Sequence, residues 1–414
     1  MRSESTDRQA TPLLVGHLAD AANRVVDEIV ETLAELPPEG VDHASLYDGA
    51  AGLAVLWTSL GALRATSTYD ALAAAWLDRA ADLLGQEPMS PSVWEGFAGV
   101  GWAFEIAGRG DDADAVDDGL AELLSADAWH GDYDLVRGLV GFGLYALDRG
   151  ARPAARRAAD RVVALLAALA TREPDGLTWY TNMALVPENE RRSEREVDLG
   201  IAHGVAGAIT FLARYVVARG GGDVAERTLR DAVRWLDARR LPDGGETRFP
   251  VKHVPGHAPE SGRNAWCYGD LGIASALLDA AEALDDRRLR EDAVATLVRA
   301  SQRPMEQWRV EDVSLCHGAA GAAHLFHRFH RRTGLAAFAD VARAWCERTL
   351  TMRRPGTGLA GFTRMKRVFP DPAVVFVPEP GLLMGVAGVA LSLASMLSPV
   401  APDWDRLLAL NPPR

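Results

Sequence analysis

One motif, Gly-x-x-Gly followed by a run of small and apolar residues, recurs along this 414-residue chain. It reads YDGAAGLAVLW at its first occurrence and LMGVAGVALSLA at its last. The seven copies have the leading glycines Gly49, Gly96, Gly138, Gly204, Gly269, Gly318 and Gly385. Such a repeat is typical of architectures in which equal units stack on one another. Because each run is small or apolar nearly all round, it predicts a helix that is buried on most sides.

A second kind of segment lies between these motifs, for example DALAAAWLDRAADLL and VAERTLRDAVRWLDAR. Apolar residues recur in it every three to four positions, and charged residues fill the other face, which predicts amphipathic helices with one face in water. The alternation predicts an all-α fold, an α/α toroid with seven inner and seven outer helices. Polar, turn-rich stretches between some units predict short loop or hairpin insertions at one mouth of the ring.

Composition narrows the classes of function. The net charge of −13 argues against nucleic-acid binding, which needs clustered Lys and Arg. No apolar stretch reaches about 18 residues, so we expect no membrane span. The three cysteines imply no disulfide framework and fit a reducing cytoplasm. Residues 1–12 are polar and predicted to be disordered, and residues 13–414 are predicted to form a single toroid domain.

Two of the three cysteines share one phase of the repeat. Cys267 and Cys316 each stand two residues before a leading glycine, and His317 follows Cys316 directly. In a closed ring, equal phase means equal height on one rim, so these neighbouring units should bring the three side chains together. Two thiols and an imidazole are a Zn²⁺ ligand set that leaves the fourth tetrahedral position open. The alternative is core packing, which is our interpretation of Cys346, out of phase in an outer helix.

Four further polar residues are candidates for chemistry at the same rim. His203 precedes the fourth leading glycine and could act as a general acid or base. Asp134 could orient that imidazole, or cap the third inner helix instead. Arg263 could hold a carbonyl or enolate oxygen, although it could also be an ordinary surface arginine. Tyr268, beside Cys267, could hydrogen-bond a substrate or a metal ligand.

Three histidines recur on one face of the sixth inner helix, at His324, His327 and His330. Their spacing could bind a metal. The simpler interpretation is that these histidines line the edge of a helix and bind no metal.

The residues named above resemble the lanthionine synthetase cyclases of lantibiotic biosynthesis. The likeness rests on WCYG at 266–269, CHG at 316–318, AHGVAG at 202–207, YD at 133–134, Arg263 and the seven Gly-x-x-Gly motifs. The resemblance implies an α/α toroid. It also implies a zinc ion held by Cys267, Cys316 and His317, acid–base roles for His203 and Asp134, and supporting roles for Arg263 and Tyr268.

The resemblance also implies a reaction and partners. A cysteine thiolate of a dehydrated precursor peptide, made of leader and core, adds to a dehydroalanine or dehydrobutyrine and closes a lanthionine or methyllanthionine thioether ring. The seven repeats use up the chain, so we expect a stand-alone cyclase that works with a separate dehydratase and a transporter in a synthetase complex. Two alternatives stay open: zinc-dependent addition of a small thiol such as glutathione to an electrophile, and a non-catalytic, zinc-stabilised peptide-binding module.

Overall fold

The structure is a computed structural model that describes residues 11–86, 88–186, 191, 193, 195–367 and 373–413. The disorder predicted for residues 1–12 therefore falls, except for residues 11 and 12, outside the described residues. All statements below concern the described part of the chain.

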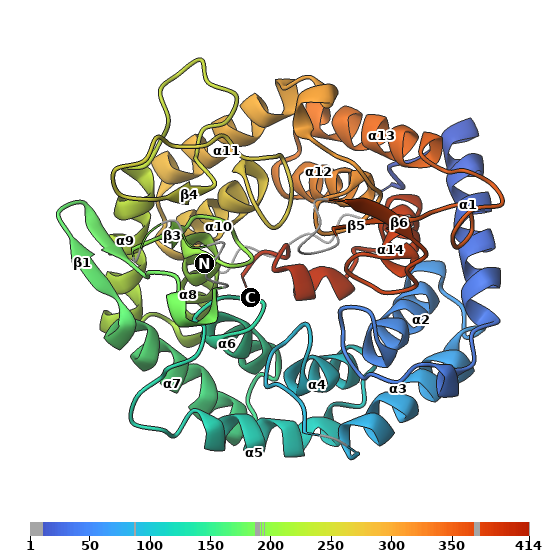
Figure 1. Cartoon of the computed structure of the whole chain (residues 1–414), viewed down its shortest axis with the longest axis horizontal. Helices are drawn as coiled ribbons and strands as arrows, with labels where there is room; N and C mark the ends of the chain where they lie inside the picture. The colour runs from blue at the N-terminus through green and yellow to red at the C-terminus, as the bar shows by residue number, and fades with distance from the viewer. Residues whose placement is uncertain are drawn as a thin grey trace.

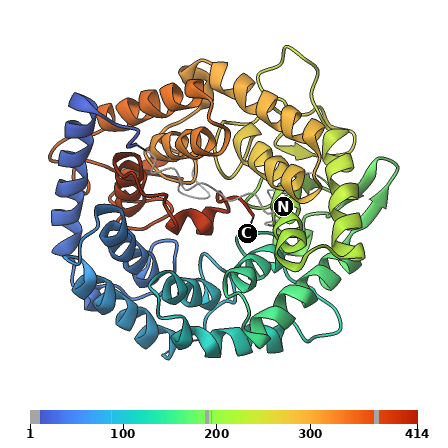
Figure 2. The ribbon, with the colours of Figure 1, turned by 180° about the vertical axis from the view of Figure 1, so that it is seen from behind.

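The described helices form two concentric rings (Figures 1 and 2). The inner ring consists of α2 (Ala50–Arg64), α4 (Phe97–Ile106), α6 (Leu139–Asp148), α8 (Val205–Arg219), α10 (Asp270–Ala283), α12 (Ala319–Thr333) and α14 (Val386–Leu397). The outer ring consists of α1 (Gly16–Ala34), α3 (Asp70–Leu84), α5 (Asp114–Leu123), α7 (Pro153–Leu169), α9 (Asp223–Asp237), α11 (Arg287–Gln302) and α13 (Ala336–Thr351). The predicted α/α toroid is confirmed.

The ring is closed. The last inner helix, α14, packs against the first, α2, and α1 covers this junction by packing on both α13 and α14. The first outer helix in the sequence thus completes the last unit of the ring. Leu13, just before α1, donates its backbone N–H to the carbonyl of Met396 at 2.9 Å, which ties the two ends of the helical array together.

The two rings differ in burial as their sequence patterns predict. Every residue of α14 from Val386 to Met396 is buried, because this helix has neighbours on all sides. The outer helix α9 buries Leu229 and Trp235 against the inner ring. Its Arg230 and Arg234 side chains lie more than half exposed on the other face. Burial of the apolar stripe of each outer helix stabilises the double ring.

Three small antiparallel sheets interrupt the helical order. Strands β1 (Thr171–Glu173) and β2 (Gly176–Thr178) form a hairpin, and so do β5 (Arg364–Arg367) and β6 (Val374–Val377). The third sheet pairs β3 (Val197–Asp198) with β4 (Lys252–His253), which lie on either side of unit four. The short insertions predicted from the turn-rich stretches are confirmed.

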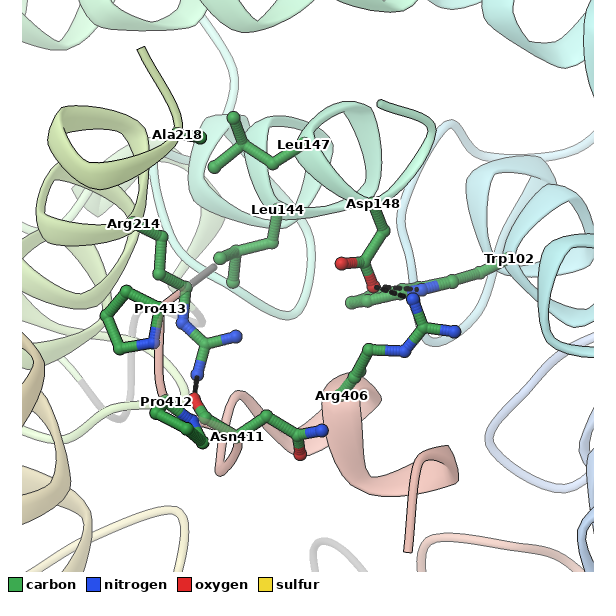
Figure 3. A pocket seen from close by; sticks show the side chains of 10 residues that line it. All are labelled: Trp102, Leu144, Leu147, Asp148, Arg214, Ala218, Arg406, Asn411, Pro412 and Pro413. Carbon is green, nitrogen blue, oxygen red and sulfur yellow. Dashed lines mark hydrogen bonds and ion pairs between the residues drawn. The ribbon is translucent and has the colours of Figure 1, made fainter. Parts of the chain in front are cut away.

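The segment after α14 folds back into the ring, and we call residues 404–413 the C-terminal plug. It begins with the 3₁₀-helix η6 (Trp404–Leu408) and approaches the C-terminal halves of α4, α6 and α8 (Figure 3). The carbonyl of Leu408 accepts a hydrogen bond from the indole N–H of Trp266 at 2.8 Å. Arg214 of α8 donates to the carbonyl of Asn411.

Asp405 anchors the plug to α12. Its buried carboxylate lies 2.9 Å from His324 Nε2 and 2.8 Å from Arg328 Nε. His324 and His327 are 1% and 2% exposed, so the interpretation of these histidines as a helix edge is wrong for both. The sequence pattern could not reveal that a distant segment covers this face of α12. None of the described helices combines the length and apolar character that crossing a membrane requires.

Candidate functional site

Backbone hydrogen bonds join the loops that lead into the inner helices. The residue two positions before each leading glycine takes part, and we call these residues the backbone belt. Belt N–H groups donate to belt carbonyls over 2.9–3.4 Å, from Tyr47 to Trp94, Val136 to Ala202, Ala202 to Cys267, Cys267 to Cys316, Cys316 to Leu383 and Leu383 to Tyr47. The seven loops are thereby held at one height, which is the physical basis for comparing side chains of equal phase.

The leading glycines make the tight approach of these loops possible. Gly269 has a φ of +101°, and a Cβ there would lie 1.8 Å from the carbonyl oxygen of Arg263. A Cβ on Gly318 would lie 2.1 Å from the backbone nitrogen of Ser314. A larger residue would push the loop away from the start of its helix. The cysteines two residues earlier would move with it.

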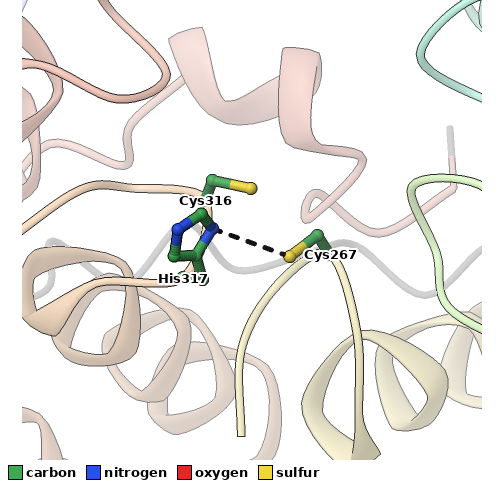
Figure 4. A group of neighbouring side chains, drawn as sticks. All are labelled: Cys267, Cys316 and His317. Carbon is green, nitrogen blue, oxygen red and sulfur yellow. Dashed lines mark hydrogen bonds between the residues drawn. The ribbon is translucent and has the colours of Figure 1, made fainter. Parts of the chain in front are cut away.

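Cys267, Cys316 and His317 come together as predicted, at the junction of units five and six (Figure 4). Their ligand atoms all lie within 4.8 Å of one another, and Cys267 Sγ is 4.0 Å from His317 Nδ1. Ligand atoms of a tetrahedral zinc site lie about 3.5–3.8 Å apart. The donor set therefore fits Zn²⁺ after closing by about 1 Å or less. Cys346 is not in this group; it is buried in outer helix α13.

The two thiols share their protons unequally. A hydrogen bond from the Cys316 thiol lowers the pKa of Cys267 well below its usual value, and His317 and Arg263 act in the same direction against the effect of burial. The same hydrogen bond, together with burial, raises the pKa of Cys316. One thiolate beside one thiol is the preferred state, because a second negative charge at the same place is unfavourable. A divalent cation would relieve that repulsion.

His203 and Asp134, from units four and three, form a close pair on the same rim. His203 Nδ1 lies 2.6 Å from Asp134 Oδ2. Burial lowers the pKa of His203, but the hydrogen bond to Asp134 and the negative charges of Asp134 and Asp198 outweigh it, so the pKa is raised. With Nδ1–H donated to the carboxylate, Nε2 is the atom left to exchange a proton with a substrate.

Asp134 does not cap α6, because the N-cap of that helix is Gly138 and no side chain bonds to it there, so the capping interpretation is wrong. Its Oδ1 accepts the backbone N–H of Arg137 at 2.7 Å, just ahead of α6. Its Oδ2 faces His203. The carboxylate is thus fixed by the local turn, and the fixed carboxylate in turn orients the imidazole.

Tyr268 and Arg263 flank the metal group and the histidine. The Tyr268 ring lies 6.2 Å from the His203 ring, between centroids, and its hydroxyl is hydrogen-bonded to the carboxylate of Asp198. Burial and the nearby charges of Asp198 and Cys267 raise the pKa of Tyr268, so its hydroxyl keeps its proton. Arg263 is partly buried, and its charge favours the thiolate of Cys267.

Sequence reasoning missed Asp198, which is 3% exposed. Its carboxylate interacts with His203 through charge and with Tyr268 through a hydrogen bond. A signal was available: Asp198 stands six residues before its leading glycine, in the same phase as Arg263. Burial raises the pKa of Asp198, and the charge of His203 opposes this.

A second group missed from the sequence lies on the other side of Cys316. Arg364, on β5, donates to the hydroxyl of the belt residue Tyr47 at 2.9 Å and lies 3.5 Å from the carboxylate of Glu379. Burial raises the pKa of Tyr47 to about 12. No repeat phase connects Arg364 with Tyr47, so the sequence offered no sign of this contact.

Among solved structures, the chain resembles nisin cyclase, with a TM-score of 0.73 at 18% sequence identity, over 94% of this chain and 97% of that one. It also matches the cellobiose 2-epimerase of Bacillus thermoamylovorans, with a TM-score of 0.49 and 10% identity, over 90% of this chain and 99% of that one. At these identities, the likeness to nisin cyclase concerns the fold. The model of the family described as lanthionine synthetase C-like protein matches residues 40–409. The chain therefore belongs to the lanthionine synthetase C-like family, as the resemblance of its motifs predicted.

Proposed function

We propose that this protein is a zinc-dependent, stand-alone peptide cyclase that forms lanthionine and methyllanthionine rings. The observation that carries the proposal is the meeting of Cys267, Cys316 and His317 on the rim where His203 pairs with Asp134. A binding module would have no use for an imidazole–carboxylate pair beside a metal group. A cyclase needs both a thiolate and a proton donor.

Cys267, Cys316 and His317 would hold the Zn²⁺. Three protein ligands leave a fourth position open to a substrate, and Cys316 and His317 are partly exposed. Bound zinc would supply the positive charge that keeps a substrate thiol in its thiolate form near neutral pH.

The bond changes follow from the chemistry of the acceptor. The substrate thiol loses its proton to solvent water. Its sulfur adds to Cβ of a dehydroalanine or dehydrobutyrine, so that the C=C electron pair moves onto Cα and the adjoining carbonyl as an enolate. Cα then takes up a proton, and the net change is addition of S–H across the double bond. His203 Nε2 delivers the Cα proton, because the raised pKa of this imidazole favours its protonated form.

Arg263 and Tyr268 stand beside the place where negative charge develops. A guanidinium and a protonated phenol are both donors, and donors fixed in advance stabilise an enolate oxygen better than mobile water does. Asp198 holds the Tyr268 hydroxyl, and Asp134 holds the His203 ring. These carboxylates are positioning residues in the proposal.

The proposed partners follow from the substrate. We propose that residues 13–414 act as one cyclase domain in the cytoplasm on a dehydrated precursor peptide with leader and core. The acceptor must come from loss of water from Ser or Thr, so a separate dehydratase must act first, and a transporter would complete the synthetase complex.

Two measurements on purified protein test the proposal. Metal analysis should find about one zinc per chain, as expected of a three-ligand site. A peptide that carries dehydroalanine and cysteine should lose its reactivity to a thiol-capping reagent without a change in mass, because ring closure is an isomerisation. Glutathione added to the same reaction should not be incorporated. A glutathione adduct in place of the ring would support the small-thiol alternative. Zinc binding without any reaction would support the peptide-binding alternative.

A further inference from the structure

The β5–β6 hairpin exposes an unusual amount of apolar surface. Val374, Val375 and Phe376 of β6 are 44%, 39% and 57% exposed. β6 pairs with β5 only, so its other edge has no strand beside it among the described residues. An exposed apolar edge strand invites pairing with another chain, and proteins generally avoid one that has no use.

In Figure 1 the β5–β6 hairpin lies near α12 and α14. Its base is hydrogen-bonded to loops of the candidate active site. Arg364 donates a hydrogen bond to Tyr47. In the backbone belt, Leu383 joins Tyr47 to Cys316, because Cys316 donates to Leu383 and Leu383 donates to Tyr47. The N–H of Met365 donates to Asp312 Oδ2 at 3.2 Å. Oδ1 of the same carboxylate accepts from the backbone N–H and the hydroxyl of Ser314, two residues before Cys316. One carboxylate therefore links the hairpin to the loop that carries Cys316 and His317.

The strand register shows which backbone groups of β6 face outward. Met365 is paired with Phe376. In an antiparallel ladder, two opposite residues either exchange both hydrogen bonds or exchange none. Because the Met365 N–H is directed to Asp312, this pair is of the second kind. The N–H and C=O of Phe376 therefore point away from β5, along the open edge.

We infer that the open edge of β6 binds the precursor peptide as an added antiparallel or parallel strand, on the hairpin whose base is bonded to the loop of Cys316 and His317. The inference rests on the proposed function and identifies where that site holds its substrate. A third strand would run about 10 Å from β5, since neighbouring strands are about 4.8 Å apart. Such pairing uses the peptide backbone, so it tolerates different sequences around each cysteine. Val374 and Phe376 offer one apolar face to the side chains of the added strand.

A proline at Phe376 tests the edge without breaking the hairpin. Of the backbone hydrogen-bonding groups, Phe376→Pro removes only an N–H that points outward, whereas the bonds to β5 stay, and it also removes the phenyl side chain. Phe376→Ala removes the side chain but keeps the N–H. Val224→Pro is the matched control, because Val224 is 48% exposed in the first turn of outer helix α9, where proline is tolerated.

The probe is a synthetic extended peptide that carries dehydroalanine and cysteine, used with the zinc-loaded full chain. Phe376→Pro should raise KM for ring closure by about tenfold or more with kcat changed by less than about twofold. Phe376→Ala should raise KM by a smaller factor, and Val224→Pro should match the wild type. Equal KM values for Phe376→Pro and the wild type would overturn the inference.

Hydrogen exchange separates this inference from the proposed function. Saturating peptide should slow amide exchange in residues 374–376 of the wild type and leave the amides of α9 unchanged. Protection without ring closure would support the docking edge while refuting the cyclase proposal. Ring closure without protection would do the reverse. A concentration-dependent dimer that protects the same amides, and that peptide does not dissociate, would assign the edge to a second copy of the chain and overturn the inference.

Discussion

The two arcs of the inner ring share one backbone plan and carry different side chains. In units four to six the belt residues are Ala202, Cys267 and Cys316, and His203 and His317 follow two of them. In units one to three they are Tyr47, Trp94 and Val136. Trp94 is fully buried and packs edge-on against Trp266, with ring centroids 6.0 Å apart. We call units four to six the active arc and units one to three the packing arc. Asp134 of unit three is the exception, because it reaches across the boundary to His203 of unit four.

From this difference we predict that the fold does not depend on the cysteines. Belt hydrogen bonds use main-chain groups, and they join six of the seven neighbouring pairs of belt residues whatever the side chains are. The repeat therefore fixes a set of equivalent positions, and the residue at each position decides whether it packs or reacts. Changes to active-arc side chains should remove chemistry and leave the ring intact.

The largest effect should follow from removing both thiols. Cys267→Ala with Cys316→Ala should reduce bound zinc from about one per chain to none, because an imidazole alone holds zinc weakly. Ring closure should fall below detection. Metal analysis and a thiol-capping mass assay measure the two effects, and circular dichroism should show the helical content unchanged.

Cys346→Ala is the matched control for the thiol variants, because Cys346 lies in α13 outside the metal group. It should keep its zinc. Stoichiometric zinc in the double variant would contradict the assignment of the metal site, and unfolding of the double variant would contradict the separation of chemistry from fold.

The next largest effect, on the rate of ring closure, should come from removing the imidazole of His203. His203→Ala should slow ring closure by about 10²–10⁴-fold with zinc content unchanged, the usual range for loss of a general acid or base. Asp134→Asn should have a smaller effect, because Asp134 acts through the imidazole. The measurement is single-turnover ring closure beside metal analysis.

The packing arc supplies a matched histidine for this test. His43 Nε2 lies 2.9 Å from Asp48 Oδ1, so unit one also has an imidazole–carboxylate pair. His43→Ala should close rings at the wild-type rate. Lost zinc in His203→Ala would make His203 a metal ligand, and an equal rate loss in both variants would remove the distinction between the arcs.

A smaller effect should appear in the free energy of unfolding when two leading glycines, Gly269 and Gly49, are each replaced by alanine. Gly269→Ala should destabilise the fold by about 1–3 kcal/mol, because its φ of +101° is costly for alanine and the new Cβ meets a carbonyl. Gly49→Ala meets a carbonyl at 2.4 Å but has a negative φ, so it should cost less. Denaturant unfolding measures both, and only Gly269→Ala should also weaken zinc binding, since it displaces Cys267.

The smallest effect should be on pH dependence. The pKa of His203 is raised in the folded state, mainly by Asp134 acting against burial. Its contribution to stability is therefore fully present below about pH 6.5, the unfolded value, and is lost as pH rises through the folded pKa. The difference in unfolding free energy between wild type and His203→Ala should shrink over that window.

In the packing arc, His43 allows the same measurement. Its hydrogen bond to Asp48 and the charges of Asp48 and Asp42 raise the pKa of His43 to about 9, although burial lowers it. The difference between wild type and His43→Ala should persist to about that pH. In Asp134→Asn the window for His203 should move to lower pH. A window that does not move would mean that Asp134 does not set the protonation of His203.

The repeat explains what the sequence could predict. The repeat phase alone predicted that Cys267 lies beside Cys316, because the backbone belt holds residues of equal phase at the same height in the ring. It also placed His203 on the same rim, although only the structure joins it to Asp134 at 2.6 Å. Contacts made by insertions follow no phase, so the link from Arg364 to Tyr47 could not be foreseen.

The sequence pattern also did not reveal that the C-terminal plug, which is not part of the repeat, buries side chains of α12. His324 and His327 sit on an inner helix whose pattern alone allows an exposed edge. They are covered because the C-terminal plug brings Asp405 against α12. A pattern that describes the units cannot describe a segment that belongs to none of them.

The C-terminal plug lies inside the ring, against α4, α6, α8 and α12. Between the plug and α4, α6 and α8 there is a cavity of about 60 Å³, room for a few water molecules and not for a peptide chain (Figure 3). A peptide chain therefore cannot pass between the plug and these three helices. In the proposed cyclase, a substrate would therefore reach the metal group from the rim of the ring and not through this part of its interior.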